Sequence, residues 1–520
     1  MDLSIITIAK DLDVLSKLLN SIENSNHNLK IEVLCSWNGN GEIKEKSQDF
    51  NFPFVINYIK PYNFAKNNNE LANKANGKVL LFINDDVVLD ENSLQTAWNA
   101  FQQDNIGIVG INLRYPNGKI QHAGVYFGEN GLSFHRFKHK LDFDDKRITS
   151  NRIVPAVTGA FIMIDRAEFL QLKFDETFLI AGEDLVLSLL YQKKFNKNVL
   201  YVGEATAIHD EGSTRRKNAT RVTPPEDVEK ITMAYKDCKE IVDSIMENYK
   251  LRIVTERHAW ILHRMASEIK SSLKNVWINQ DVSDADIHYY INYGLFNKKP
   301  SNGIVVANFT HYDPNLLNEE FIQVAKEVEH CISISEETTK TMKSLDIDEN
   351  KISTVIIGAD KSFKPKLTLG VVGRVYPSGR KGEDMLKEIC EDDELMQDMQ
   401  IVSLNDCWGL PVWNLNADDF YRAIDYLLVP SLLEGGPIPF MEALASGTLA
   451  IAPPIGVIPQ FPHIEYETGN IVSLKKTIRN VKNNFLDRRL RIAEYMEDYD
   501  WERWAYTHDK IFKKLLFDLD

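Results

Sequence analysis

The sequence predicts an α/β protein built on parallel sheets that helices cover. Short apolar strand candidates at 3–8, 31–36, 54–59 and 79–83 alternate with helical patterns such as VLSKLLNSI. This alternation is typical of a parallel sheet with helices on its faces. A second apolar series begins after residue 105, a third runs to about residue 360, and a fourth begins at LTLGVVGRV.

The length and one polar segment predict the domain organisation. A chain of 520 residues has room for about three domains of ordinary size. The segment STRRKNATRVTPPEDV at 213–228 is basic and carries two prolines, which indicates a loop or linker. We therefore predict domains at 1–245, 246–365 and 366–520.

Composition excludes several classes of protein. A formal net charge of −15 argues against a nucleic-acid groove binder, which needs a basic footprint to displace counterions. The five cysteines show no CxxC spacing, so we expect neither a structural zinc site nor a disulfide framework. No apolar run reaches the roughly 18 residues of a membrane span, and the N-terminus lacks a signal-peptide pattern. We expect a cytoplasmic protein. The weakly amphipathic end KIFKKLLFDLD predicts a packed terminal helix, with peripheral membrane contact at most as the alternative.

An apolar strand ends abruptly in acids. Leu80–Ile83 are followed by Asn84, Asp85 and Asp86, after which the chain turns apolar again. Strand ends face a cleft in an open α/β sheet. Neighbouring carboxylates in a cleft are stable when a divalent cation lies between them, although the same residues also fit an ordinary Asx turn.

Three further segments of the sequence carry residues that could join these acids in one site. The segment NNNELANKANGK (67–78) predicts a helix that brings Asn and Gly toward the same strand. Glu183 and Asp184 begin a predicted helix, whose N-terminal amides favour negative charge. His209 ends a predicted strand. The structural alternatives are that Glu183 and Asp184 only cap their helix and that His209 has no functional role.

The ordered motifs NDD, TGAFIMIDR, FDETF, GED and IHDEGST resemble a glycosyltransferase of family 2, the inverting GT-A type, over about residues 3–215. The resemblance implies that Asp86 and His209 bind Mg²⁺ or Mn²⁺, with Asn84 and Asp85 near the ribose and diphosphate of the donor. Departure of a nucleotide diphosphate needs stabilisation of negative charge, and the acceptor hydroxyl needs a base. We assign the base to Asp184, with Glu183 as the second choice.

The chain departs from the family pattern in two places. The first predicted strand is followed by IAKD and not by a turn resembling YNR. The second is followed by SWNGNGE, so Asn38 stands where the family often carries an acid that contacts uracil. We expect Asn38 on the donor side, with the nucleotide base left open.

A second constellation lies in the last third of the chain. LGVVGRVYPSGRKGEDML predicts a strand, a glycine-containing loop and a helix, with Arg374, Arg380 and Lys381 where phosphates meet a helix start. Glu434 and Glu442 stand eight positions apart around a Gly-Gly-Pro turn.

This second run resembles the C-terminal half of a glycosyltransferase of family 4, the retaining GT-B type, and CISISEETTKTM with KISTVIIGADKSFKP resembles the crossing between its halves. The resemblance implies that Arg374 and Lys381 bind the donor diphosphate, Glu442 the ribose and Glu434 the donor sugar, without a metal. His311 is a candidate acceptor-side residue, with a structural role as the alternative.

The predicted fold class is therefore α/β, with a GT-A Rossmann-like domain followed by a compact GT-B module of two Rossmann-like halves. The predicted function is a two-headed glycosyltransferase that uses nucleotide-diphosphate sugars to extend an oligosaccharide or lipid-linked glycan in surface polysaccharide assembly. The inner face of the membrane is the candidate place of action. One alternative keeps a single catalytic head and makes the other an acceptor-binding or docking module. Another is a non-catalytic nucleotide-sugar-binding scaffold. A sugar nucleotidyltransferase is disfavoured, because IAKDLDV offers no basic glycine-rich loop after the first strand.

Overall fold

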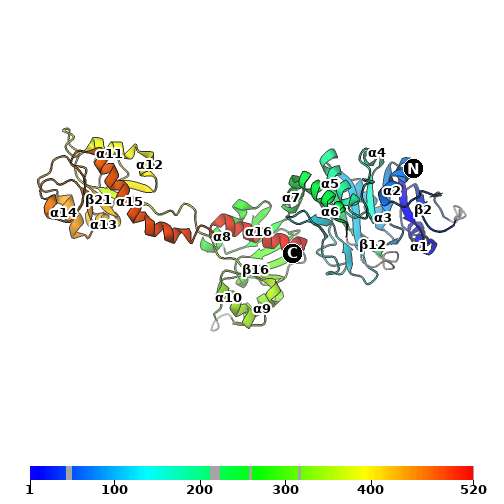
Figure 1. The fold of residues 1–520 in the computed structure, drawn as a ribbon. Helices are drawn as coiled ribbons and strands as arrows, with labels where there is room; N and C mark the ends of the chain where they lie inside the picture. The colour runs from blue at the N-terminus through cyan, green and yellow to red at the C-terminus, as the bar shows by residue number, and fades with distance from the viewer. Residues whose placement is uncertain (42–49, 211–222, 257–259, 314–317, 519–520) are drawn as a thin grey trace. The chain divides into compact units, whose positions relative to one another are not determined.

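The computed structural model describes residues 1–41, 50–210, 223–256, 260–313 and 318–518. They form two compact units, 1–355 together with 505–520, and 356–504. The units contain three main β-sheets, each with helices packed against it (Figure 1). The predicted α/β class is confirmed.

The first sheet has the strand order β10-β12-β6-β11-β4-β1-β2-β3, with β5 paired to β12 and β7 paired to β6. Its strands are β1 (Leu3–Ala9), β2 (Ile31–Trp37), β3 (Phe54–Asn57), β4 (Val79–Ile83), β5 (Val87–Leu89), β6 (Ile106–Arg114), β7 (Ile120–His122), β10 (Arg152–Ile153), β11 (Phe161–Asp165) and β12 (Asn198–His209), beside a separate hairpin of β8 (Val125–Phe127) and β9 (Ser133–His135).

The helices of this part are α1 (Leu12–Glu23), α2 (Phe64–Lys74), α3 (Ser93–Phe101), α4 (Arg166–Phe169), α5 (Glu183–Phe195), α6 (Pro225–Asp237) and α7 (Lys239–Met246). Helix α1 illustrates why they form. The Asp11 carboxylate caps its N-terminus by accepting the backbone N–H groups of Asp13 and Val14 at 3.0 and 3.3 Å. Its buried residues follow the spacing of one helix face, Leu15, Leu18, Leu19 and Ile22.

The first sheet is mixed and not purely parallel. Strand β11 runs antiparallel to both of its neighbours, β4 and β6. The chain reaches β11 beside the carboxyl end of β4, since Phe161 pairs with Ile83. A strand that enters from that edge can only run back along the sheet, which the parallel pattern predicted from the sequence did not anticipate.

The second sheet is entirely parallel, in the order β14-β13-β15-β16-β17-β18. It contains β13 (Leu251–Val254), β14 (Val276–Ile278), β15 (Ile287–Tyr290), β16 (Ile304–Phe309), β17 (His330–Ser333) and β18 (Ile352–Thr354), with helices α8 (Trp260–Ser272), α9 (Asn318–Glu327) and α10 (Glu336–Ser344).

The third sheet is also parallel, in the order β20-β19-β21-β22-β23. It contains β19 (Leu367–Val371), β20 (Met399–Ser403), β21 (Tyr426–Leu428), β22 (Ala450–Ala452) and β23 (Ile464–Glu465), with helices α11 (Glu383–Cys390), α12 (Asp393–Met396), α13 (Ala417–Ala423), α14 (Ile438–Ala445) and α15 (Ile471–Glu494).

The last helix, α16 (Trp501–Phe517), returns the chain from the third sheet to the second (Figure 1, red beside green). Tyr289 of β15 bonds His508 at 2.9 Å, and the Tyr249 hydroxyl donates to Asp509 at 2.7 Å. Phe512 and Phe517 are buried, so this helix uses its apolar face for packing. None of the described helices is long and apolar enough to span a bilayer.

Candidate functional site

Strand pairing brings the acids after β4 and the histidine at the end of β12 together. The backbone turns after Ile83, with the Val87 N–H donating to the Asn84 carbonyl at 3.2 Å, and β5 then pairs antiparallel with β12 in a register that sets Val87 opposite His209. The Asp210 N–H donates to the Asp86 carbonyl at 3.2 Å. Two sequence-predicted site residues, Asp86 and His209, are thus neighbours.

The side chains of Asp86 and His209 meet directly. Asp86 Oδ1 lies 3.1 Å from His209 Nε2, and the two side chains are 14% and 7% exposed. On the other side of the ring, Nδ1 lies 2.8 Å from Gln121 Oε1, an oxygen that only accepts, so in this arrangement Nδ1 carries a proton. The Asn84 amide nitrogen lies 3.4 Å from Nε2.

This arrangement fits a divalent cation. In the neutral imidazole, Nε2 presents a lone pair toward a carboxylate oxygen, and two acceptors at that distance repel unless a positive charge lies between them. Carboxylate oxygen and imidazole nitrogen are both ordinary metal ligands, and the Gln121 bond fixes the tautomer as outer partners of metal ligands do. Within the described ranges, no group of three or more His, Cys, Asp or Glu side chains surrounds one metal position. A cation held here would therefore draw further ligands from water or a bound phosphate.

We expect Gln121→Leu to weaken Mn²⁺ binding about 10- to 100-fold, because His209 loses the partner that fixes its ring. The measurement is Mn²⁺ titration of the protein, followed by electron paramagnetic resonance and calorimetry. Gln121→Glu keeps an acceptor oxygen and should stay within about threefold of the wild type. Equal Mn²⁺ affinity of the Leu variant and the wild type would contradict this role.

Asp85 lies near the ends of β1 and β2. Burial, followed by the charge of Asp86, raises the pKa of Asp85 to about 7, against the opposing effect of the Lys10 backbone N–H and side chain. A carboxylate that is costly to ionise here, first because of burial and then because of the neighbouring charge of Asp86, would be stabilised by a nearby positive charge. This is the electrostatic counterpart of the Asp86–His209 geometry.

Asn38 follows β2 on the same edge of the sheet. Its backbone N–H donates to the Ala9 carbonyl at 2.7 Å, and its amide donates to Ser36 Oγ at 3.1 Å. The Asn67 amide of α2 donates to the same Ser36 oxygen at 2.8 Å. The structure therefore sets Asn38 at the carboxyl end of β2, beside the end of β1, whereas residues 42–49 that follow it lie outside the described residues.

Asp184 occupies the first turn of α5. Its Oδ2 accepts the Gly159 backbone N–H at 2.6 Å, and its Oδ1 accepts the Leu185 N–H at 2.9 Å. A Cβ at Gly159 would lie 3.2 Å from the Phe64 ring and 3.3 Å from Asp184 Oδ2, so glycine permits this close approach. The neighbouring Ala160 carbonyl accepts the Asn84 N–H at 3.2 Å. Asp184 therefore lies at the same end of β4 and β11 as the acids.

Accessibility distinguishes the two carboxylates of the acidic pair. Glu183 is buried at 7% exposure, whereas Asp184 is partly exposed. A base must reach the proton that it removes. The geometry favours Asp184 over Glu183 for that role.

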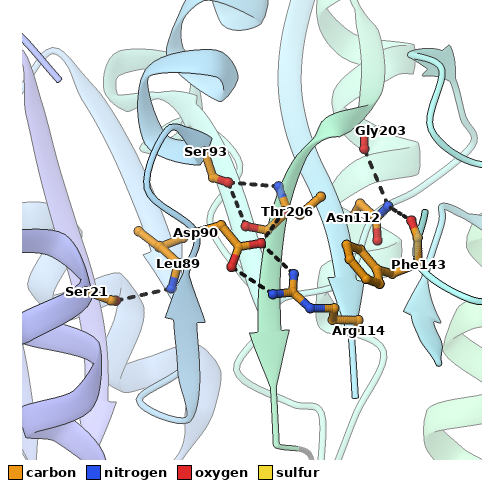
Figure 2. Close-up of polar contacts among 9 residues, drawn as sticks. All are labelled: Ser21, Leu89, Asp90, Ser93, Asn112, Arg114, Phe143, Gly203 and Thr206. Carbon is orange, nitrogen blue, oxygen red and sulfur yellow. Dashed lines mark hydrogen bonds and ion pairs between the residues drawn. The ribbon is translucent and has the colours of Figure 1, made fainter. Parts of the chain in front are cut away.

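A polar cluster around Asp90, directly after β5, links β5 to β12 and β6 (Figure 2). The Arg114 guanidinium donates to both oxygens of Asp90 at 2.5 and 2.8 Å, and the Thr206 hydroxyl donates to the same carboxylate. Burial alone would raise the pKa of Asp90. The bonds from Arg114 and Thr206 lower this pKa by more, so it lies below its usual value. Ser93 Oγ donates to the Thr206 carbonyl at 2.6 Å and accepts the Thr206 N–H at 2.9 Å. This cluster holds the strand that carries His209.

The second constellation lies at the carboxyl edge of the third sheet. The order of that sheet reverses between β19 and β21, which is where ligands bind in doubly wound sheets. Lys381 forms an ion pair with Glu434, their side chains are 16% and 9% exposed, and Ser431 Oγ donates to the same Glu434 oxygen at 2.8 Å. The structure brings Lys381 and Glu434 together.

Arg374 and Glu442 do not join that pair directly. Arg374 is exposed in the loop after β19. Glu442, exposed on α14, accepts the Tyr421 hydroxyl at 2.8 Å. In the second sheet, His311 follows β16 and its Nδ1 lies 2.9 Å from the Thr310 hydroxyl. Each of these three side chains has a position beside its own sheet, and its role stays a prediction.

Sequence reasoning missed several residues that support the sites. Gln121 and Ser431 orient His209 and Glu434, yet each is an ordinary polar residue outside any spacing pattern. Gly159 lay within the TGAF motif, and a glycine followed by a buried strand was a usable signal of close backbone approach.

Comparisons with known proteins agree on the N-terminal part. Residues 4–169 match the family described as Glycosyl transferase family 2. The O-antigen biosynthesis protein RfbC of Myxococcus xanthus is 33% identical over 172 residues, 32% of this chain and 13% of that protein. The uncharacterized protein y4gI of Sinorhizobium fredii is 32% identical over 121 residues, 22% of this chain and 13% of that protein. The chain thus spans about an eighth of the length of these curated relatives.

Two solved structures are similar at low identity. GalNAc-T7 with UDP, GalNAc and Mn²⁺ is 14% identical, with 46% of this chain and 50% of that one covered and a TM-score of 0.36. Residues 1–349 of TarS from S. aureus with UDP-GlcNAc are 16% identical, with 48% and 67% covered and a TM-score of 0.33. From the family match and the identity to RfbC, the N-terminal part of this chain carries a glycosyltransferase family 2 domain.

Proposed function

We propose that the protein is a two-headed glycosyltransferase, with a first head in residues 1–245 and a second head in residues 246–520. The observation that carries the proposal is the meeting of Asp86 and His209 at 3.1 Å, beside an Asp184 anchored on Gly159, within a part of the chain that carries a family 2 domain. A carboxylate and an imidazole that can bind a metal, next to a fixed and accessible carboxylate, suit transfer from a nucleotide-diphosphate sugar.

In the first head, Asp86 and His209 hold Mg²⁺ or Mn²⁺, and Gln121 keeps the imidazole in the required tautomer. The bound cation supplies positive charge for the departing nucleotide diphosphate. Asn84 and Asp85 lie toward the ribose and diphosphate, and Asn38 lies on the donor side at the end of β2. Asp184, with Glu183 as second choice, accepts the proton of the acceptor hydroxyl. Attack from the face opposite the leaving group inverts the linkage, so an α-linked donor gives a β product.

In the second head, a GT-B module, residues 246–365 form the acceptor half and 366–520 the donor half. Support comes from two parallel sheets with switch-point orders and from α16, which returns the chain from the third sheet to the second. Arg374 and Lys381 bind the donor diphosphate, Glu442 the ribose and Glu434 the sugar. The two cationic side chains do here what a metal does in the first head, and transfer retains the donor configuration.

The acceptor is a growing oligosaccharide or lipid-linked glycan of a surface polysaccharide. The identity with a protein named for O-antigen biosynthesis supports this class of acceptor. Fusing the heads raises the concentration of the first product near the second site. We propose that the protein meets a lipid-linked acceptor at the cytosolic face of the membrane, through peripheral contact.

The test is a panel of nucleotide sugars incubated with wild type and Asp86→Ala, with and without EDTA, in which hydrolysis and transfer are followed. We expect at least one donor whose turnover falls by 10³-fold or more with either the substitution or the chelator. If neither Asp86→Ala nor EDTA changes the turnover of any donor, only the second head is catalytic. Donor binding without any product would instead identify a nucleotide-sugar-binding scaffold.

A further inference from the structure

Helix α6 makes a set of contacts that the proposed chemistry does not use. It begins at Pro225, beyond the segment that follows His209, and packs against the loop 177–182 that leads into α5. Its contacting residues, Asp227, Lys230 and Ile231, have the spacing of one helix face. The loop they contact ends at the acidic pair.

The Asp227 carboxylate is fully buried and accepts three consecutive backbone N–H groups of this loop. The distances are 3.0 Å to Leu179, 2.8 Å to Ile180 and 3.3 Å to Ala181. Burial alone would raise the pKa of Asp227, but these backbone bonds lower it by more, so the pKa lies below its usual value. The side chain is therefore an ionised carboxylate at neutral pH. The only cation close to it among the described residues is Lys230, whose Nζ lies 4.0 Å from Oδ1.

Two further contacts fix the same loop. Lys230 Nζ donates to the Thr177 carbonyl at 2.7 Å and lies 4.8 Å from the centre of the Phe178 ring. Gly182 has φ +120°, and a Cβ there would lie 2.4 Å from Ile231 Cδ1, so α6 approaches the backbone directly before the acidic pair. Leu179, by contrast, is 67% exposed, so burial of that side chain does not hold the loop.

We propose that Asp227 is a positioning residue of the first head, which fixes loop 179–181 and thereby the Asp184 carboxylate at the start of α5. The catalytic part of this inference rests on the proposed function of Asp184. Three N–H groups that converge on one carboxylate define the loop path more tightly than single bonds would. A base displaced by about 1 Å loses on the order of 10²-fold in rate.

The test compares Asp227→Asn with Glu226→Gln, an exposed acid in the same helix turn. The nearly isosteric amide turns one acceptor oxygen into a donor that faces backbone N–H groups. We expect faster hydrogen exchange at the amides of Leu179, Ile180 and Ala181, with unchanged exchange in β4 and β11 as the sign of an intact fold. For the EDTA-sensitive donor that the wild type turns over, kcat should fall between about 10- and 10²-fold while the donor KM stays within threefold.

Unchanged exchange at 179–181 in Asp227→Asn would overturn the inference, and so would faster exchange with unchanged kcat. Equal effects of Glu226→Gln would also overturn it, because the helix charge and not the loop bonds would then be responsible. If the wild type transfers no sugar, the proposed function fails, and the exchange data still decide whether Asp227 fixes the loop.

Discussion

Asp184→Asn is expected to lower sugar transfer by the first head about 10²- to 10⁴-fold, with little change in donor KM. The amide keeps the size of the side chain and can still accept the Gly159 N–H bond, which is 2.6 Å long in the native protein, but it cannot take a proton from the acceptor hydroxyl. The measurement is kcat and KM for donor and acceptor at saturating Mn²⁺.

Glu183→Gln is the matched control for this substitution, because it removes the neighbouring carboxylate from the same helix turn. Since Glu183 is buried, we expect this variant to retain transfer within about tenfold of the wild type. The reverse pattern, with Asp184→Asn active and Glu183→Gln inactive, would move the base to Glu183. Full activity of both variants would contradict the base assignment altogether.

Lys381→Ala is expected to reduce turnover by the second head at least 10²-fold and to leave the first head unchanged. The substitution removes a cation from the donor phosphates and leaves the largely buried Glu434 without its ion-pair partner. Leaving one buried charge unpaired typically costs about 3–5 kcal/mol in the free energy of unfolding. The activity of the wild type and of Lys381→Ala is measured with the EDTA-resistant donor. The free energy of unfolding of both proteins is measured alongside.

Two variants separate the loss of function from the loss of stability. Lys387→Ala, at an exposed lysine on helix α11, which begins two residues after Lys381, should change neither quantity. The double variant Lys381→Ala/Glu434→Ala removes both charges, so it should recover stability relative to Lys381→Ala and remain inactive. Recovery of activity with stability would mean that the ion pair is structural and does not bind the donor.

The sequence was a good guide wherever local patterns decide the structure. The strands at 3–8, 31–36 and 79–83 appear as β1, β2 and β4, because short apolar stretches between polar turns have few other ways to be buried. The meeting of Asp86 with His209 depends on something the sequence does not display, the pairing register of β5 with β12. The ordered motifs suggested it only through resemblance to a family.

Other features depend on contacts between residues far apart in the chain. Gln121 meets His209 across 88 positions, and the Asp227 carboxylate meets loop residues 46 to 48 positions earlier. No periodicity or spacing in the sequence marks such partners, because the two residues lie on different elements and meet only when the chain folds. The direction of β11 belongs to the same class, because it follows from the edge at which the chain re-enters the sheet.

The most direct test of two independent heads measures Asp86→Ala and Glu442→Ala against every donor that the wild type turns over, with and without EDTA. The two-headed account predicts a crossed result. One donor is lost with Asp86→Ala and with EDTA but kept by Glu442→Ala, and another, EDTA-resistant donor shows the opposite pattern. If Glu442→Ala changes the turnover of no donor, the second head is not catalytic and the account is contradicted.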